Sequence, residues 1–254
     1  MPRCKCLINR EKCVQQSSVL RQLASVTTNG STAGYAFDTR GNLTTKGGQS
    51  VGFDLGNRLS WSSVGGSDAY DGLRRRFSIA SSDGSTRIQV YSQAGQILWA
   101  TSTGGARPNS TTAYVYLGGK QIAEINSASG TQYMHVDTLG SPVAHTGPAG
   151  ALINRVRFEP YGYVAAGTKP SSSASVIGFT GPVQDAETDL VYMRQRYYDP
   201  IAGRFLSVDP IVTDANMGKG FGLIAMSIII LSRELTLMAE NQGQPAYPIP
   251  IATI

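Results

Sequence analysis

Polar and apolar residues alternate in short runs along the middle of the chain, and turn-forming residues separate the runs. The run at 87–91 alternates strictly between polar and apolar residues, which is typical of a half-exposed β-strand. Across residues 31–210 no long stretch shows the 3.6-residue period of an amphipathic helix. The pattern therefore predicts an all-β fold of short antiparallel strands.

One sequence unit recurs through the first half of this region. It consists of an aromatic residue, usually an aspartate, a turn that contains glycine, and an apolar or basic strand, and it occupies 37–43, 53–59, 70–76 and 91–98. An aspartate can cap such a turn and a glycine can supply a positive φ. Because one hairpin is only marginally stable, neighbouring copies must cover each other. We expect a curled antiparallel array with turns near Gly41, Gly56, Gly72 and Gly95.

The second half, residues 113–210, also consists of strand and turn segments, with more aromatic residues. Large apolar side chains of such strands are expected to supply the core. We expect the following residues to be substantially buried: Tyr114, Tyr116, Ile122, Tyr133, Phe158, Phe179, Tyr192, Tyr197 and Phe205.

Six motifs occur in order in this half: YVYLGGKQIAE, YMHVDTLGSPV, FEPYG, IGFTG, DAETDLVYMRQRYYDP and GRFLSVDP. Together they resemble the RHS repeat-associated core preceded by YD repeats, over residues 35–216. The resemblance implies a spiral β-shell that the core closes at its C-terminal end. It also implies that intact relatives are secreted or at the cell surface and enclose a C-terminal toxin, which the core of some relatives cuts free using aspartates.

The resemblance assigns the family motif to particular positions of this chain. They are Tyr133, His135, Asp137, Gly140, Pro142, Pro160, Gly162, Arg196, Tyr197, Tyr198, Asp199, Pro200, Gly203, Arg204, Phe205, Asp209 and Pro210.

Four segments follow from the repeats, the charge and the resemblance. Residues 1–30 are expected to be an unstructured basic leader, 31–112 YD-type repeats, 113–216 the RHS repeat-associated core, and 217–254 a divergent tail. The family pattern stops near Asn216, and back-translation of the tail permits that pattern in a shifted reading frame. We therefore expect an out-of-frame tail that is disordered or forms an adventitious helix, and a partial shell too short to enclose a cargo.

The charge distribution argues against nucleic-acid binding. The net charge is +5. Residues 1–30 contain five basic residues against Glu11, or +4, which leaves +1 for the rest of the chain. Nucleic-acid binders instead gather Lys and Arg on the folded face that makes contact.

The cysteines do not predict a metal site. Cys4, Cys6 and Cys13 supply three ligands, while His135 and His145 are more than 100 residues further along the chain. A structural zinc site needs a fourth ligand within reach. We expect three free thiols, no metal and no cofactor.

The sequence shows neither a secretory signal nor a membrane span. The longest apolar run, 223–231, is shorter than the ~20 residues that a spanning helix needs. The chain, expressed as given, is therefore expected to be cytoplasmic.

Aspartates before proline are the first candidates for chemistry. Autoprocessing would require two cooperating carboxylates, with Asp209 or Asp214 supplying one. Asp199 and Asp209 each precede a proline, however, and this favours capping of a turn. We interpret both as turn caps and expect no catalytic residue.

Two further constellations are interpreted as structural. His135 and Asp137 would share one face of a strand, with Ser141 nearby, which suits a structural hydrogen bond. The second constellation is an expected ion-pair network beside the tyrosines, formed by Arg194, Arg196 and Arg204 with Glu187 and Asp189.

The sequence therefore predicts a non-enzymatic, structural shell fragment. Its expected partner is the remainder of an RHS shell or its C-terminal toxin. One alternative is an aspartyl autoprocessing core that releases a toxin. Another is a carbohydrate-binding module that contacts a surface glycan through exposed tyrosines and Trp61 or Trp99.

Overall fold

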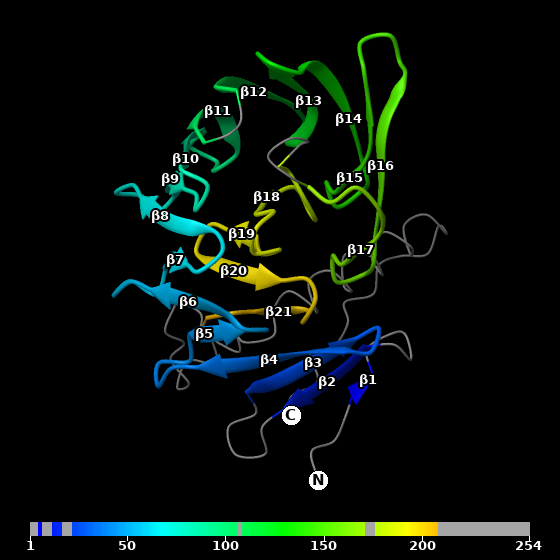
Figure 1. Ribbon diagram of the computed structural model, residues 1–254. Coiled ribbons are helices and arrows are strands. Elements are labelled where there is room, and N and C mark those ends of the chain that lie inside the picture. Colours follow the sequence, from blue (N-terminus) through cyan, green and yellow to red (C-terminus); the bar gives the residue numbers. More distant parts are fainter. Residues whose placement is uncertain (1–4, 7–11, 17–21, 106–107, 171–175, 208–254) are drawn as a thin grey trace, which may run out of the picture. The chain divides into compact units, whose positions relative to one another are not determined.

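A computed structural model describes residues 5–6, 12–16, 22–105, 108–170 and 176–207 (Figure 1). All of them belong to one compact unit, residues 1–210. Within the described ranges every regular element is a β-strand. The predicted all-β fold is confirmed.

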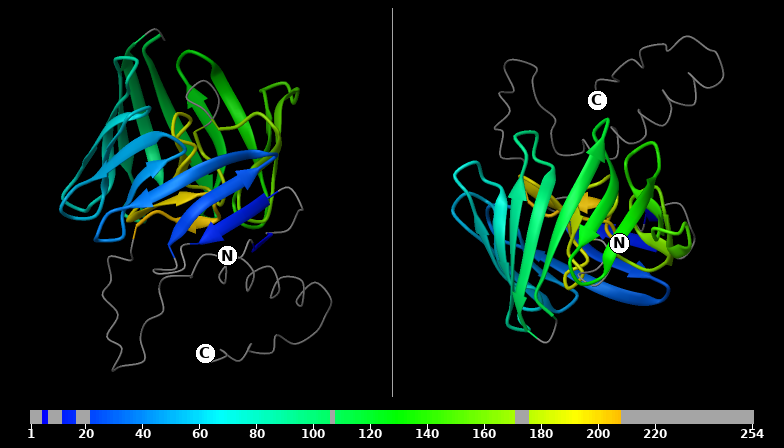
Figure 2. Two further views of the ribbon diagram at one scale, coloured as in Figure 1. Left: turned by 60° about the horizontal axis from the view of Figure 1, so that its bottom comes forward. Right: turned by 90° about the horizontal axis from the view of Figure 1, so that it is seen from above.

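Seventeen strands form one antiparallel sheet, here called the wall, in which each strand pairs with the strand before it in the chain. No described residue of β17 pairs with β1, so the described part of the sheet does not close. The sheet curves round a hollow side (Figures 1 and 2), which agrees with the predicted curled array. The strands are β1 Lys5–Cys6, β2 Lys12–Gln16, β3 Leu23–Thr28, β4 Ser31–Phe37, β5 Leu43–Lys46, β6 Gln49–Phe53, β7 Leu59–Ser62, β8 Gly66–Tyr70, β9 Arg76–Ala80, β10 Ser85–Tyr91, β11 Ile97–Gly104, β12 Ser110–Leu117, β13 Lys120–Asn126, β14 Gly130–Val136, β15 Pro142–Thr146, β16 Leu152–Phe158 and β17 Val164–Gly167.

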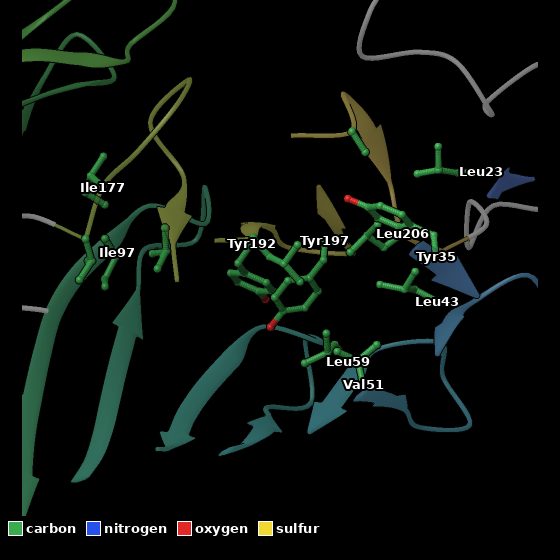
Figure 3. Close-up of a cluster of buried hydrophobic side chains, with 14 of the residues drawn as sticks. Leu23, Tyr35, Leu43, Val51, Leu59, Ile97, Ile177, Tyr192, Tyr197 and Leu206 are labelled. Atoms are coloured by element: carbon green, nitrogen blue, oxygen red, sulfur yellow. The ribbon is translucent and has the colours of Figure 1, made fainter. Parts of the chain in front are cut away.

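A second, four-stranded sheet occupies the concave side of the wall (Figure 1). Residues 176–207, here called the plug, contain this sheet. Figure 3 shows its Tyr192, Tyr197 and Leu206 among wall side chains such as Leu43 and Leu59. The main hydrophobic core therefore lies between plug and wall. The plug strands are β18 Val183–Gln184, β19 Val191–Met193, β20 Arg196–Asp199 and β21 Arg204–Phe205.

The same five-residue turn recurs along the wall and occurs once in the plug. In the turn at 38–42, the Asp38 amide donates to the Asn42 carbonyl at 2.8 Å and the Gly41 amide donates to the Asp38 carbonyl at 3.0 Å. The fourth residue has a positive φ, 81° at Gly41. The same backbone bonds occur in the turns 54–58, 71–75, 81–85, 92–96, 137–141, 147–151, 159–163 and 178–182.

The four predicted turns are present, but the role expected of two glycines is wrong. At 54–58 and 71–75 the residues with positive φ are Asn57 at 58° and Arg74 at 62°, not Gly56 and Gly72. The backbone hydrogen bonds place the left-handed residue fourth in the turn, and these glycines stand third and second. The hydrogen-bond pattern, rather than the nearest glycine, fixes the position.

Consecutive repeats are joined by the last residue of each turn. Asn42 donates from Nδ2 to Oδ1 of Asn57 in the next turn at 3.0 Å. The guanidinium of Arg58 lies 4.8 Å from the ring centroid of Tyr70, the aromatic residue of the following repeat. Arg75 stands in the same relation to Tyr91 at 6.0 Å. These contacts tie each hairpin to its neighbour.

The expectation of an unstructured leader at residues 1–30 is wrong for its described part. β1 pairs with β2 and β2 with β3. Leu23 and Val26 of β3 are 3% and 1% exposed in the main core. These apolar residues extend the wall, although the charge excess around them had suggested a tail. The predicted tail, 217–254, lies outside the described residues.

The concave face of the wall is apolar where it packs against the plug, as at Leu43 and Leu59, but one strand reverses the usual arrangement. On β10, Gln89 is buried, whereas Ile88 and Val90 on either side are 37% and 51% exposed. The alternation in this strand therefore confirms the strand but points the apolar residues outward. Period-two alternation cannot tell which face of a sheet is covered.

The core prediction is correct for most of its members. Tyr114, Phe179, Tyr192 and Tyr197 are buried, and Tyr116, Phe158 and Phe205 are half-buried. It is wrong for Ile122 and Tyr133, which are 38% and 45% exposed. Both belong to the outer face, since their sequence neighbours on either side are buried.

Candidate functional site

The most densely bonded polar cluster of the described chain joins wall to plug around Arg76 of β9. Its guanidinium donates to the two carboxylate oxygens of Asp185 at 2.6 and 2.7 Å. It also donates to Asp68 of β8 at 3.3 Å and to the Tyr197 hydroxyl at 2.9 Å. Tyr197 in turn donates to Asp68, and the Arg76 side chain is 1% exposed.

Charge and burial oppose each other in this cluster. Burial raises the pKa of Asp68; Arg76 lowers it and Asp185 raises it, and the net pKa lies above the ordinary value. Burial lowers the pKa of Arg76, but Asp185, Tyr197 and Asp68 outweigh burial and hold the pKa well above the ordinary value. The guanidinium also lies over the ring of Tyr192 at 4.6 Å. Such a buried charge is tolerable because it is paired and hydrogen-bonded.

A second attachment is centred on Asp199 of β20, which is 0% exposed. One carboxylate oxygen accepts the Tyr35 hydroxyl of β4 at 2.7 Å and pairs with Lys46 of β5 at 3.1 Å. The other accepts the amides of Ile201 and Ala202 at 2.8 and 3.2 Å. Asp199 therefore caps a turn, as the sequence indicated, and also fastens the plug to the wall. Burial, followed by the Asp199 charge, raises the pKa of Tyr35.

A third attachment joins the plug to the β15–β17 side of the wall. The rings of Phe158 and Phe179 lie 5.8 Å apart, and the Tyr198 hydroxyl donates to the Tyr161 carbonyl at 2.9 Å. A side chain at Gly162 would begin 2.4 Å from the Phe179 ring, and its φ is 84°. Only glycine fits there, which gives the family motif position a physical reason.

The remaining motif residues serve turns and packing. Pro142 and Pro200 are buried and Pro160 is exposed. Gly140 and Gly203 have φ values of 90° and 67°. The guanidinium of Arg196 stacks 3.7 Å from the Phe205 ring centroid, and burial lowers the pKa of Arg204.

The structure separates His135, Asp137 and Ser141 rather than joining them. His135 lies outside and bonds Thr146 at 3.0 Å. Asp137 accepts the amides of Leu139 and Ser141 at 2.9 and 2.8 Å as a turn cap. The Ser141 hydroxyl, fully buried, accepts the Thr180 amide at 3.1 Å. Each residue has its own hydrogen-bond partner, and the partner of His135 is Thr146 rather than Asp137.

The predicted ion-pair network is wrong at two of its members. Asp189 pairs with Lys169 at 2.8 Å, and Arg194 donates to the Ala94 carbonyl. The buried ion pairs form instead around Arg76 and Lys46, neither of which the sequence singled out. Three consecutive arginines at 74–76 were the available signal, because an uninterrupted run leaves at least one for the buried face.

A cavity of about 340 Å³ lies between plug and wall, and Arg76, Asp68 and Asp185 are part of its lining. Gln89, Thr112 and Glu124 of the wall and Gln184 of the plug contribute to its lining. Apolar side chains such as Ile79 of the wall and Val183 of the plug complete the lining, so the cavity is mixed in character.

The structure does not describe the expected autoprocessing aspartates, and its described residues form neither a metal site nor a membrane-spanning helix. The two autoprocessing candidates, Asp209 and Asp214, lie outside the described residues. The motif residue Pro210 lies outside them as well. Among the residues that the structure describes, no three His, Cys, Asp or Glu side chains gather as a metal site would require. The described ranges likewise contain no helix long and apolar enough to cross a membrane.

Comparison with known proteins gives a family match over most of the chain. The family model described as "Teneurin YD-shell" matches residues 10–219. Teneurin-1 of Gallus gallus is 34% identical over 137 residues, which is 54% of this chain and 5% of the relative. The putative uncharacterized protein YibJ of Escherichia coli K12 is 34% identical over 77 residues, 30% of this chain and 33% of the relative.

Solved structures share the fold. In the Photorhabdus luminescens Tc holotoxin pore, one chain matches with a TM-score of 0.60 and 19% identity, covering 80% of this chain and 12% of that chain. A structure described as TcdB2–TccC3 without hypervariable C-terminal region matches with a TM-score of 0.52 and 18% identity, covering 79% and 11%. The chain thus spans a small fraction of the relatives it matches.

Proposed function

Because the chain belongs to the teneurin YD-shell family, we propose that it is a non-catalytic structural piece of a β-shell. In this proposal the plug closes the hollow side of the wall, and a polypeptide held in that hollow is the toxin of the RHS-type relatives. The described wall is open between β1 and β17, and in this proposal further YD repeats complete it.

The observation that carries the proposal is the fastening of the plug at three places along the wall. Arg76, Asp199 and the aromatic contacts of Phe179 hold one 32-residue segment, 176–207, against strands from β4 to β16. The buried family-motif side chains take part in packing and capping. A segment held in this way supports closure of a shell better than turnover of a substrate.

The test uses the full chain with a reporter polypeptide fused after Ile254. A longer YD-repeat polypeptide of the same family is co-produced with the chain. The complex is isolated by size-exclusion chromatography and then treated with protease. We expect the reporter to be digested on the chain alone and protected in the complex. Arg76→Met should restore digestion, whereas Arg40→Met, at an exposed ion pair, should not. A reporter digested equally with and without the wall partner would contradict the proposal.

Autoprocessing makes a different prediction. A self-cleaving chain would yield a second, smaller band on expression and lose it on Asp209→Asn. We expect one band for both forms. Cleavage that depends on Asp209 would replace the non-catalytic proposal with the aspartyl alternative.

Exposed tryptophan gives limited support to a glycan-binding role. Trp61 and Trp99 are 45% and 42% exposed. A side chain at Gly52 would meet the Trp61 ring at 2.1 Å, so Trp61 packs over Gly52, which leaves Trp99 as the candidate. A glycan array probed with the full chain and with Trp99→Ala tests this role, and it fails if no glycan is bound or if the substitution changes nothing.

A further inference from the structure

Two cysteines are directly opposed across the first two strands. Cys6 of β1 pairs in register with Cys13 of β2, next to the pair of Lys5 with Val14. The sequence indicated three free thiols in an unstructured leader. Strand pairing alters that expectation, because it holds two of the three cysteines at matched positions.

The register meets the backbone requirement for a disulfide. Directly opposed residues of an antiparallel pair have Cα atoms about 4.5 or 5.5 Å apart, depending on the hydrogen-bonding of the pair. Disulfides join residues whose Cα atoms are about 4.4–6.8 Å apart. Opposed positions also share one face of the sheet. We propose that Cys6 and Cys13 form a disulfide that fastens the edge strand β1 to the wall.

The fastening reaches the core through two further strands. β2 pairs with β3 at five positions, and β3 places Leu23 and Val26 in the main core. β1 by itself pairs at only two positions. A covalent link at Cys6 therefore secures β1, the strand of the described wall with the fewest pairings, to β2, which is well anchored through β3.

The reaction needs a small-molecule disulfide such as oxidised glutathione. One cysteine thiolate attacks it, forms a mixed disulfide and releases one glutathione. The second cysteine attacks the protein sulfur of the mixed disulfide and releases the other glutathione. The two protein thiols lose two protons and two electrons, and the oxidant becomes two glutathione thiols. Lys5 and Lys12 adjoin the cysteines in sequence, and nearby positive charge favours the reactive thiolate.

The sequence provides an unambiguous readout with the full chain. Trypsin cleaves after Arg3, Lys5, Arg10, Lys12 and Arg21, which places Cys4, Cys6 and Cys13 on three separate peptides. The native chain is equilibrated in glutathione buffers of increasing oxidation, alkylated, digested and analysed by mass spectrometry. We expect peptides 6–10 and 13–21 to be joined and one of the three cysteines to remain alkylatable.

Variants and a denatured control separate register from chance. Cys4→Ser should leave the link unchanged, whereas Cys6→Ser or Cys13→Ser should abolish it. In the native chain the link should form with an equilibrium constant at least about tenfold larger than in the chain in denaturant, because the register raises the effective concentration of one thiol at the other. A link through Cys4, equal constants in the two states, or three alkylatable thiols in the most oxidising buffer would overturn the proposal.

Discussion

Arg76 and Asp185 are joined by two hydrogen bonds of 2.6 and 2.7 Å, although 109 residues separate them in the chain. Because the pair is buried, removing the cation leaves the carboxylates of Asp68 and Asp185 without their counterion. We expect Arg76→Met to lower the free energy of unfolding by about 3–5 kcal/mol. Urea denaturation followed by circular dichroism measures the change.

The control for this substitution is Arg40→Met. Arg40 pairs with Asp38 at 3.6 Å and its side chain is 46% exposed, so we expect a loss of no more than about 1 kcal/mol. Equal losses in the two variants would show that the Arg76 cluster does not fasten the plug.

Tyr35 tests the second attachment. Its hydroxyl donates to the buried carboxylate of Asp199 at 2.7 Å, and Tyr35→Phe removes that donor while retaining the ring. We expect a loss of about 1.5–3 kcal/mol, the range for hydrogen bonds to charged groups. Tyr133→Phe on the outer face is the matched control and should leave stability unchanged. If Tyr35→Phe is as neutral as the control, Lys46 alone is sufficient for the carboxylate oxygen of Asp199 that Tyr35 contacts.

The contrast between these attachments and the turns shows what the sequence could reveal. Turns such as 38–42 are local, since five consecutive residues contain both the capping aspartate and the left-handed position, and the repeat therefore predicted them. The bond between Tyr35 and Asp199 spans 164 residues and has no local signature. Asp199 was interpreted as a turn cap, which is correct, but its wall partners depend on how the whole sheet curves.

The sequence did not reveal which face of each strand is buried, and the reason is different. Alternation at Ile88, Gln89 and Val90 predicts a strand whichever face is covered. Gln89 is buried on the concave side, where it contributes to the lining of the cavity between plug and wall. Assigning apolar residues to the core therefore misplaced Ile122 and Tyr133, because in both strands the sequence neighbours on either side are the buried residues.

Arg74 provides a test of backbone strain in the repeated turn. It adopts a φ of 62° at the fourth position, where seven of the nine turns have glycine with an unstrained left-handed backbone, as at Gly41. We expect Arg74→Gly to stabilise the chain by about 1 kcal/mol. Leu73→Gly, one residue earlier in the same exposed turn and without a positive φ, should destabilise it by about 0.5–1 kcal/mol. Thermal unfolding compares the two, and a stabilising Leu73→Gly or a destabilising Arg74→Gly would refute the assignment.

The turn aspartates predict loss of stability in acid. The pKa values of Asp38, Asp54 and Asp71 are held below the ordinary 3.8, because hydrogen bonds and basic partners in each turn outweigh the opposing effect of burial. Their stabilisation is complete above pH 3.8 and is lost as the pH falls through the lowered values. Asp68, with a raised pKa, acts in the opposite direction. We expect the free energy of unfolding of Asp71→Asn to fall less steeply below pH 3.8 than that of the unaltered chain. An equally steep fall in the two would contradict this prediction.

His145 predicts a separate loss at milder acidity. His135 and His145 are the two histidines of the chain, and His145 is 3% exposed on β15. Burial, and then the charge of His135, lowers the pKa of His145 below 6.5. The unfolded chain therefore takes up the proton first, so the free energy of unfolding falls as the pH drops from 6.5 toward the lowered value; above 6.5 both states are neutral and the group contributes no pH dependence. Between about pH 8 and about pH 5, His145→Met should lose less stability than the unaltered chain. His135→Gln removes the exposed histidine and should keep most of the slope, because burial is the larger cause. If instead His145→Met left the slope intact, the buried position of His145 would have no part in the response to acid, and the prediction would be wrong.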